Sequence, residues 1–229
     1  MEDYRQFQPK GLQRTRENIE WTIAYSYNAR DCENPRVLLI GDSICHQYHG
    51  EVRKNLADCV NISYWASSKC VTDPDYFRQL DFYLDAYRYD MICFNNGLHS
   101  LVGTDLDEWK IAYEAVLAFM QAKHPQAKVS LVLSTPPRDD RKADILTVKE
   151  INRMTVEIAE KWKLPVVDLF TPMDALDKWE NMTDTLHFAE PAKAMQGEIM
   201  AEHIRRQLTL QAGGIAQTGS ETGPDGAID

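Results

Sequence analysis

Five short apolar runs, separated by longer segments of helical periodicity, constrain the fold of this chain more than any other feature of its sequence. Each run is rich in Val, Ile and Leu, and they cover residues 36–41, 60–66, 90–96, 128–134 and 164–170. Apolar residues at successive positions are typical of strands that are covered on both faces. The runs therefore predict a parallel sheet of about five strands, buried between two layers of helices.

The segments around these runs predict helices over residues 14–29, 44–57, 75–87, 107–124, 147–163 and 190–210. In the fourth of them, Trp109, Ala112, Tyr113 and Val116 fall at i, i+3, i+4 and i+7 and form one apolar stripe. Regular alternation of strand and helix favours a single α/β domain with right-handed crossovers. We expect a three-layer α/β/α fold.

The chain divides by composition into three parts. Residues 1–33 form an N-terminal extension with a predicted helix, and residues 34–210 carry the alternating pattern of the α/β domain. Residues 211–229 are rich in Gly, Ser, Thr and Asp and offer little apolar surface to bury. They therefore predict a disordered tail.

The charge of the chain limits its partners. The 25 Lys and Arg residues are outnumbered by 35 Asp and Glu residues, which gives a formal net charge of −10. Binding to nucleic acid needs a basic face, so we expect no nucleic-acid partner, and an anionic membrane surface is disfavoured for the same reason. The N-terminus lacks the apolar stretch of a signal peptide, which predicts a cytoplasmic location.

The cysteines and histidines predict no cofactor. The five cysteines are scattered without CxxC spacing, so neither a disulfide framework nor a zinc site is expected. His46 and His49 have a spacing that could support a metal, but no third ligand stands out beside them. We expect no metal and no organic cofactor.

Ser43 lies where the first apolar run ends and a helix begins. In open α/β sheets, ligands bind beyond the carboxyl ends of the strands, which is where this residue falls. The N–H groups at the start of a helix favour negative charge and could hold the oxyanion of an acyl-transfer intermediate. Ser43 is therefore a candidate nucleophile, while the alternative is that Asp42 or Ser43 only caps the helix.

A candidate base for this serine follows the last strand. His187 lies three residues after Asp184, one helical turn, so the carboxylate can turn back to the imidazole and set its tautomer. A serine nucleophile requires such an oriented base. The alternative is that Asp184 and His187 are simply polar residues of a loop.

These residues resemble the SGNH hydrolases, also called GDSL-type esterases and lipases. The segment "GDSI" at 41–44 matches the first sequence block of that family, and "DTLH" at 184–187 matches its last block, Asp-x-x-His. The resemblance spans about residues 34–210, and it implies a flavodoxin-like α/β fold.

The resemblance also implies an activity. It assigns Ser43 as nucleophile, His187 as general base and Asp184 as the residue that orients it, in a hydrolase acting on small-molecule esters. An acetyl group on a carbohydrate is the favoured substrate by family analogy. A non-catalytic binding protein and an acyltransferase using the same triad remain alternatives.

The two middle blocks of the family depart from its pattern and leave the oxyanion donors open. The second block usually supplies a Gly, whereas this chain reads "WASSKCVTD", so Ser67 or Ser68 would have to provide the N–H group. The third block is usually Gly-x-Asn-Asp, whereas this chain reads "FNNGLHS", which leaves Asn95 or His99 as the side-chain donor beside the Ser43 N–H. One such donor contributes roughly 3–4 kcal/mol to the transition state.

Four further residues are candidates to contact the substrate, because they lie at predicted strand ends: Asp42, Trp65, Gly97 and Arg138. The alternative for each is ordinary packing or solvated surface charge.

Overall fold

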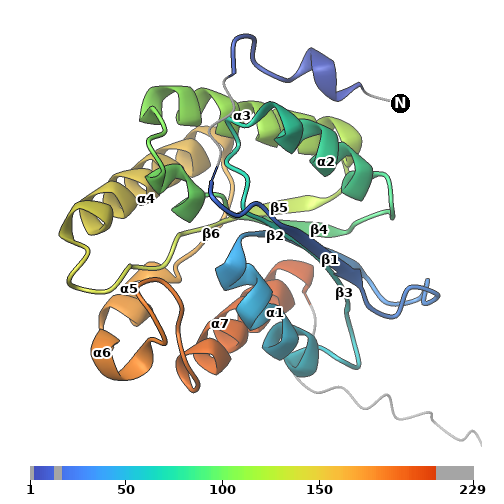
Figure 1. The fold of residues 1–229 in the computed structure, drawn as a ribbon. Coiled ribbons are helices and arrows are strands. Elements are labelled where there is room, and N and C mark those ends of the chain that lie inside the picture. Colours follow the sequence, from blue (N-terminus) through green and yellow to red (C-terminus); the bar gives the residue numbers. More distant parts are fainter. Residues whose placement is uncertain (1–2, 13–16, 210–229) are drawn as a thin grey trace, which may run out of the picture.

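The computed structural model describes residues 3–12 and 17–209, and it confirms the predicted α/β class. A six-stranded sheet lies between two layers of helices (Figure 1). Its strands, in the order β1-β3-β2-β4-β5-β6, are Thr22–Ser26, Asn61–Ser67, Arg36–Gly41, Met91–Phe94, Lys128–Val132 and Val166–Val167. All neighbouring pairs are parallel except β1 with β3.

Helices α2, α3 and α4 cover one face of the sheet, and α1 and α7 cover the other (Figure 1). The α-helices α1 to α7 are Ser43–Asn55, Pro74–Leu84, Leu106–Lys123, Lys142–Trp162, Phe170–Asp174, Lys178–Asn181 and Ala192–Leu208. Two 3₁₀ helices are η1 (Tyr4–Gln6) and η2 (Leu98–Leu101). Among the described residues, no helix combines the length and the apolar character needed to cross a membrane.

Strand β2 shows why its residues are apolar at successive positions. Its side chains alternate between the two faces, so Leu38 and Ile40 join the core beneath α2, α3 and α4. Val37 and Leu39 join the second core, on the side of α1 and α7. Because helices cover both faces, neither set of side chains is left to solvent.

The helix predicted over residues 14–29 is wrong for residues 22–26, which form strand β1. This strand pairs antiparallel with β3, in a register that places Thr22 opposite Ser67 and Ser26 opposite Ser63. Its sequence, TIAYS, combines β-branched and aromatic residues that fit a half-buried pleated surface. The Nε1–H of the buried Trp65 donates to Thr22 Oγ1 at 2.8 Å and ties β1 to the sheet.

The last predicted strand, 164–170, is much shorter than expected. Only Val166 and Val167 pair with β5. The Asp168 side chain then accepts a hydrogen bond from the N–H of Thr171 at 2.9 Å, and α5 begins at Phe170. The predicted tail at 211–229 lies outside the described residues.

Helices α1 and α7 approach each other closely at Gly197. A Cβ atom on Gly197 would lie 2.4 Å from Glu51 Cβ and 3.2 Å from the backbone N of Val52. Gly50, in the same pair of helices, would meet nothing within 4 Å. The two glycines therefore form a matched pair, since only one of them is required by packing.

We expect Gly197→Ala to lower the free energy of unfolding by about 1–3 kcal/mol, because α1 and α7 would have to move apart. Gly50→Ala should instead raise it by up to about 1 kcal/mol, through better helix propensity. Urea unfolding followed by circular dichroism measures both. Equal effects of the two substitutions would contradict the close helix contact.

A buried histidine also links stability to pH. His203 lies on α7, and its Nε2 atom is 2.9 Å from Ser130 Oγ. Burial, assisted by the charge of Arg206, lowers the pKa of His203 to about 4. The unfolded chain takes up this proton near pH 6.5. The contribution of His203 to stability is therefore complete above pH 6.5 and is lost as the pH falls towards 4.

We expect the wild-type protein to lose about 2 kcal/mol more unfolding free energy than His203→Gln between pH 7.5 and pH 5. Urea unfolding of both proteins at the two pH values gives this difference. The other histidines are common to both proteins, so their effects cancel. If the free energy of unfolding depended on pH in the same way for both proteins, His203 would not be held neutral by burial.

Candidate active site

Ser43 stands at the turn between β2 and α1. A Cβ atom on Gly41 would lie 2.6 Å from Cys45 Cβ, so the chain can turn into the helix only with glycine there. The Asp42 side chain accepts a hydrogen bond from the N–H of Ile44 at 2.9 Å and caps α1. Asp42 therefore acts as the cap and leaves the Ser43 hydroxyl available for another partner.

His187 is that partner. Its Nε2 atom lies 2.7 Å from Ser43 Oγ, although 144 residues separate them in the chain. On the other side of the ring, Nδ1 lies 2.7 Å from Asp184 Oδ2. The structure thus brings together in one line the three residues that the sequence singled out as nucleophile, base and orienting carboxylate.

The segment carrying Asp184 and His187 is a closed loop. A bridge between Met182 and Phe188 joins its two ends, and the N–H of Thr183 donates to the His187 carbonyl at 2.8 Å. Phe188 is fully buried in a small core that also contains Met173. This anchoring positions the imidazole of His187.

The Asp184 carboxyl is held in its ionised form. Partial burial alone would raise its pKa, but hydrogen bonds from the N–H groups of Leu186 and His187, and from the imidazole, outweigh burial and lower the pKa. An ionised carboxylate on Nδ1 keeps the proton on that nitrogen and leaves the Nε2 lone pair for the Ser43 hydroxyl. This is the arrangement that removes a proton from a serine.

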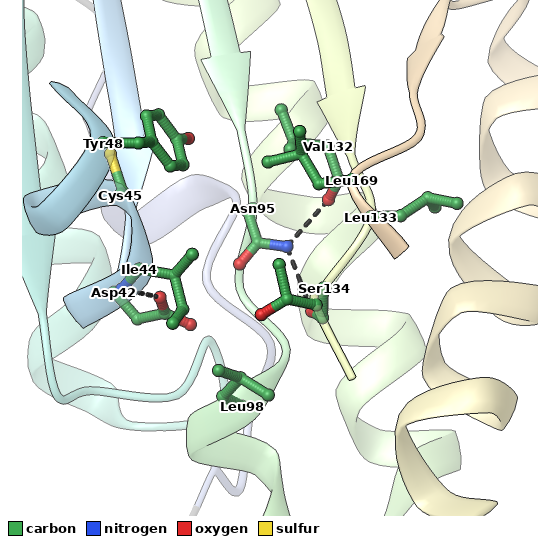
Figure 2. Close-up of a pocket in the computed structure, with 11 residues that line it drawn as sticks. Asp42, Ile44, Cys45, Tyr48, Asn95, Leu98, Val132, Leu133, Ser134 and Leu169 are labelled. Carbon is green, nitrogen blue, oxygen red and sulfur yellow. Dashed lines mark hydrogen bonds between the residues drawn. The ribbon is translucent and has the colours of Figure 1, made fainter. Parts of the chain in front are cut away.

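Asn95 does not offer its amide to this site. Its Nδ2 group donates to the Val132 carbonyl at 2.7 Å and to Ser134 Oγ at 3.1 Å (Figure 2). These bonds join the end of β4 to the end of β5. The expectation that Asn95 is an oxyanion donor therefore needs correction, because both of its amide hydrogens already have acceptors.

The polar groups of Ser68 also have partners within the fold. Its N–H donates to the Trp21 carbonyl at 3.1 Å, and its hydroxyl accepts a hydrogen bond from the Trp21 N–H at 2.9 Å. These bonds extend the pairing of β1 with β3 by one residue. In the same loop, the N–H of Lys69 donates to Ser67 Oγ at 3.2 Å. The expectation that Ser68 provides an oxyanion N–H is therefore corrected too.

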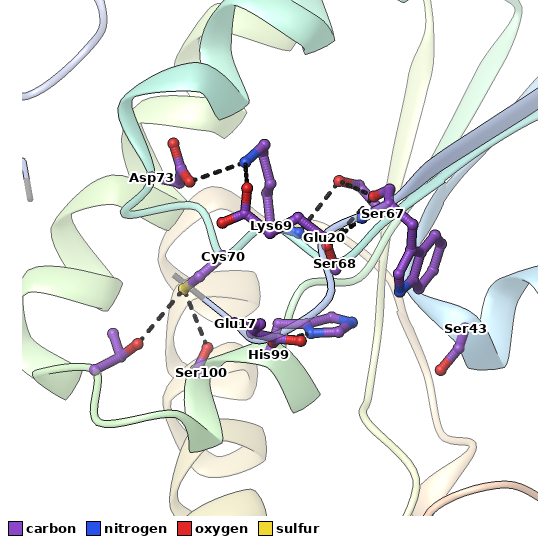
Figure 3. Close-up of polar contacts among 12 residues, drawn as sticks. Glu17, Glu20, Ser43, Ser67, Ser68, Lys69, Cys70, Asp73, His99 and Ser100 are labelled. Carbon is purple, nitrogen blue, oxygen red and sulfur yellow. Dashed lines mark hydrogen bonds and ion pairs between the residues drawn. The ribbon is translucent and has the colours of Figure 1, made fainter. Parts of the chain in front are cut away.

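His99, the other side-chain candidate, is paired with a residue that sequence reasoning missed. Its Nδ1 atom lies 2.5 Å from Glu17 Oε1 (Figure 3). Glu17 precedes β1 and is 82 residues away in sequence. No local pattern could have identified this partner, because the contact depends on the path of the N-terminal segment across the sheet edge.

Two expected substrate contacts are structural instead. Trp65 is fully buried in the core beneath α2, with its ring 5.2 Å from that of Tyr83, which excludes a substrate-contacting role. A Cβ on Gly97 would lie 1.9 Å from Ser134 Oγ, so this glycine lets η2 lie against the end of β5.

Arg138 does reach the candidate site. Its N–H donates to the Thr185 carbonyl at 2.9 Å, which fastens the 138 region to the loop of His187. Its guanidinium forms two 3.0 Å hydrogen bonds with Asp140 and lies 4.3 Å from the ring centroid of the exposed Trp179. The Asp140 carboxylate raises the pKa of Arg138 above its usual range.

A cavity of about 10 Å³ lies between the start of α1 and the ends of β4 and β5 (Figure 2). Asp42, Ile44, Asn95 and Leu98 are among the residues that line it. A space of this size holds about one water molecule. The cavity is therefore too small to hold an ester substrate. Within residues 3–12 and 17–209, no cluster of His, Cys, Asp or Glu side chains could hold a metal ion.

Solved structures with a similar fold include esterases and lipases. The acetyl xylan esterase AlAXEase superposes with a TM-score of 0.62 at 16% identity, covering 74% of this chain and 99% of the esterase. The psychrotrophic esterase EstA from Pseudoalteromonas sp. gives a TM-score of 0.62 at 17% identity, covering 77% of this chain and all of the esterase, 100%.

A GDSL-like lipase from Bacteroides thetaiotaomicron gives a TM-score of 0.59 at 16% identity, covering 75% of this chain and 88% of the lipase. By sequence, no protein-family model and no curated protein matches this chain. The chain therefore has the fold of the SGNH hydrolases, as its sequence blocks predicted, although it is only 16% or 17% identical to these three structures.

We expect Asn95→Ala to lower the free energy of unfolding by about 1–3 kcal/mol, because the Val132 carbonyl and Ser134 hydroxyl lose their donor. Asn181 is the matched control, since its Nδ2 group donates to the carbonyl of the exposed Asp177. Asn181→Ala should change stability by less than about 0.5 kcal/mol. Equal stability of the wild-type and Asn95→Ala proteins in urea would contradict the structural role of Asn95.

Proposed function

We propose that this protein is a serine esterase that hydrolyses a small acyl ester. The observation that carries this proposal is the line of two 2.7 Å hydrogen bonds from Ser43 Oγ through His187 to Asp184. It joins three residues from two distant segments at the sheet edge where open α/β folds bind their ligands. Packing alone does not require such a line, because His187 and Asp184 both retain exposed surface.

In the first half of the reaction, the Ser43 hydroxyl attacks the ester carbonyl while His187 Nε2 accepts its proton. The imidazolium then gives that proton to the leaving alcohol as the carbon–oxygen bond breaks, which leaves an acyl group on Ser43. In the second half, a water molecule attacks the acyl carbonyl and gives a proton to Nε2. Collapse of this intermediate releases the carboxylic acid and returns the proton to Ser43.

The first turn of α1 supplies stabilisation for the negative charge of the intermediate. The N–H of Ser43 lies at the helix N-terminus, where backbone N–H groups have no acceptor within the helix. Such groups and the helix dipole favour an oxyanion beside them. Asp184 contributes by stabilising the imidazolium that forms on His187.

An acetyl ester of a carbohydrate is the substrate that we propose. Support comes from the fold, since two similar structures are acetyl xylan esterases, AlAXEase and Axe2 from Geobacillus stearothermophilus. The exposed Trp179, held against Arg138 beside the His187 loop, offers an aromatic face of the kind on which sugar rings pack.

A non-catalytic binding protein is the second candidate. The observation in its favour is that the Asn95 amide and the Ser68 N–H, both expected to hold the oxyanion, are used within the fold. The same fold would then bind an ester or sugar without turning it over. Reaction of Ser43 with an active-site probe separates the two candidates.

We expect a fluorophosphonate probe to label Ser43 in the wild-type protein and to leave Ser43→Ala unlabelled. Ser43→Ala should also lower the hydrolysis of p-nitrophenyl acetate by at least about 10⁴-fold, since the nucleophile is lost. Ser67→Ala is the control, because Ser67 lies at the same sheet edge, at the end of β3, and its hydroxyl accepts a hydrogen bond from the N–H of Lys69. Unlabelled wild-type protein would favour the binding function.

Asp184→Asn should lower kcat for the same ester by roughly 10²–10⁴-fold while KM changes little. The amide cannot hold the proton on His187 Nδ1 as a carboxylate does, so Nε2 is no longer fixed as the acceptor. Steady-state kinetics measures the effect, and circular dichroism shows whether the fold is kept. Full activity in the folded variant would remove Asp184 from the mechanism.

A further inference from the structure

The segment of residues 17–21, which we name the N-terminal strap, crosses the ends of β3 and β4 on its way to β1. It is fastened at three places (Figure 3). Glu17 binds His99, Glu20 lies 3.3 Å from Lys69 Nζ, and Trp21 exchanges backbone and hydroxyl hydrogen bonds with Ser68. The strap therefore belongs to the same sheet edge as Ser43.

His99 lies in η2, the 3₁₀ helix that follows β4, at the same sheet edge as the candidate nucleophile. Strands β2 and β4 are neighbours, with Ile40 opposite Phe94, and the N–H of Asn95 donates to the Ile40 carbonyl at 2.9 Å. Ser43 follows β2 and His99 follows β4, so their loops leave the sheet side by side. The His99 side chain keeps 15% of its surface exposed.

The two carboxylate–histidine pairs at this sheet edge, Asp184–His187 and Glu17–His99, are bonded through the same ring nitrogen. In each pair the carboxylate contacts Nδ1, so Nε2 is the ring atom that can bond to a third group. An ionised carboxylate can only accept a hydrogen bond, so a neutral ring carries its proton on Nδ1 and a lone pair on Nε2. In His187 that lone pair meets the Ser43 hydroxyl.

The Nε2 atom of His99 is the ring atom that a ligand could contact. In the part of the chain that the structure describes, no group bonds to this atom. The ring cannot turn freely to present its other nitrogen, since Glu17 holds Nδ1 and the Trp21 ring lies edge-on to it with centroids 6.0 Å apart. A fixed acceptor of this kind selects a ligand that brings a hydrogen-bond donor.

We propose that Glu17 and His99 form a subsite that accepts a hydrogen bond from a hydroxyl group of the substrate alcohol. The inference rests on the proposed esterase function and narrows its substrate class. It assigns to this protein acyl esters of polyhydroxylated compounds that keep a free hydroxyl beside the ester. Glu17 is the positioning residue, and His99 Nε2 is the atom that contacts the substrate.

The test compares two substrates that differ in one hydroxyl. The first is a monoacetylated methyl xyloside with a free hydroxyl beside the ester, and the second is its deoxy analogue. Glu17→Leu should lower kcat/KM about tenfold for the first substrate, because Nδ1 loses its acceptor and the ring no longer keeps Nε2 unprotonated. The deoxy analogue should change by less than about twofold, since it makes no such bond.

Glu20→Leu is the matched control, since Glu20 fastens the same strap through its ion pair with Lys69. It should affect the two substrates equally. Glu17→Asp, which keeps a carboxylate, should recover part of the discrimination. An equal loss on both substrates in Glu17→Leu would make His99 an oxyanion donor and would overturn the proposal, as would no change on either.

A second measurement keeps this inference separate from the esterase proposal. The ¹⁵N shifts of His99 should report the Nδ1–H tautomer in the Ser43→Ala protein, and addition of the acetylated xyloside should move the Nε2 signal. The deoxy analogue should leave that signal in place. If the wild-type protein hydrolyses neither ester, the esterase proposal fails while these shifts still decide the subsite. An Nε2 signal that does not move would overturn it.

Discussion

The parallel pairing of β2 with β3 on one side and β4 on the other is the constraint on which the rest of the molecule depends. Every residue of β2 is buried, so the strand can move neither along nor across the sheet without exposing apolar surface. Because β2 is held in place, the turn at Gly41 and the start of α1 are held in place as well. The core therefore positions Ser43, the proposed nucleophile, through the strand that precedes it.

Two carboxylate–imidazole pairs face the edge that β2, β3 and β4 create. Asp184 and His187 are close in sequence, and one short loop, anchored by Phe188, holds both of them. Glu17 and His99 come from segments far apart and depend on the strap that enters β1. The physical principle is the same in both pairs, because a carboxylate on Nδ1 decides what Nε2 can do.

The oxyanion donors could not be predicted from short sequence motifs. A backbone N–H or a side-chain amide is available to a substrate only when no neighbour has taken it. The Trp21 carbonyl takes the N–H of Ser68, and β5 takes the amide of Asn95, and neither neighbour is adjacent in sequence. A short motif suggests candidate donors, but it does not show which acceptors lie beside them in the folded chain.

The sequence by itself determined the α/β class, the central strands and the association of Ser43 with Asp184 and His187, because apolar runs and short motifs are local signals. It did not determine that residues 22–26 form a strand, since an edge strand of mixed exposure has no clear period and owes its pairing to β3. Only the tertiary structure decided that Glu17 meets His99. That contact needs the strap to cross the sheet edge, and a path of that kind is set by long-range pairing, which residue spacing does not record.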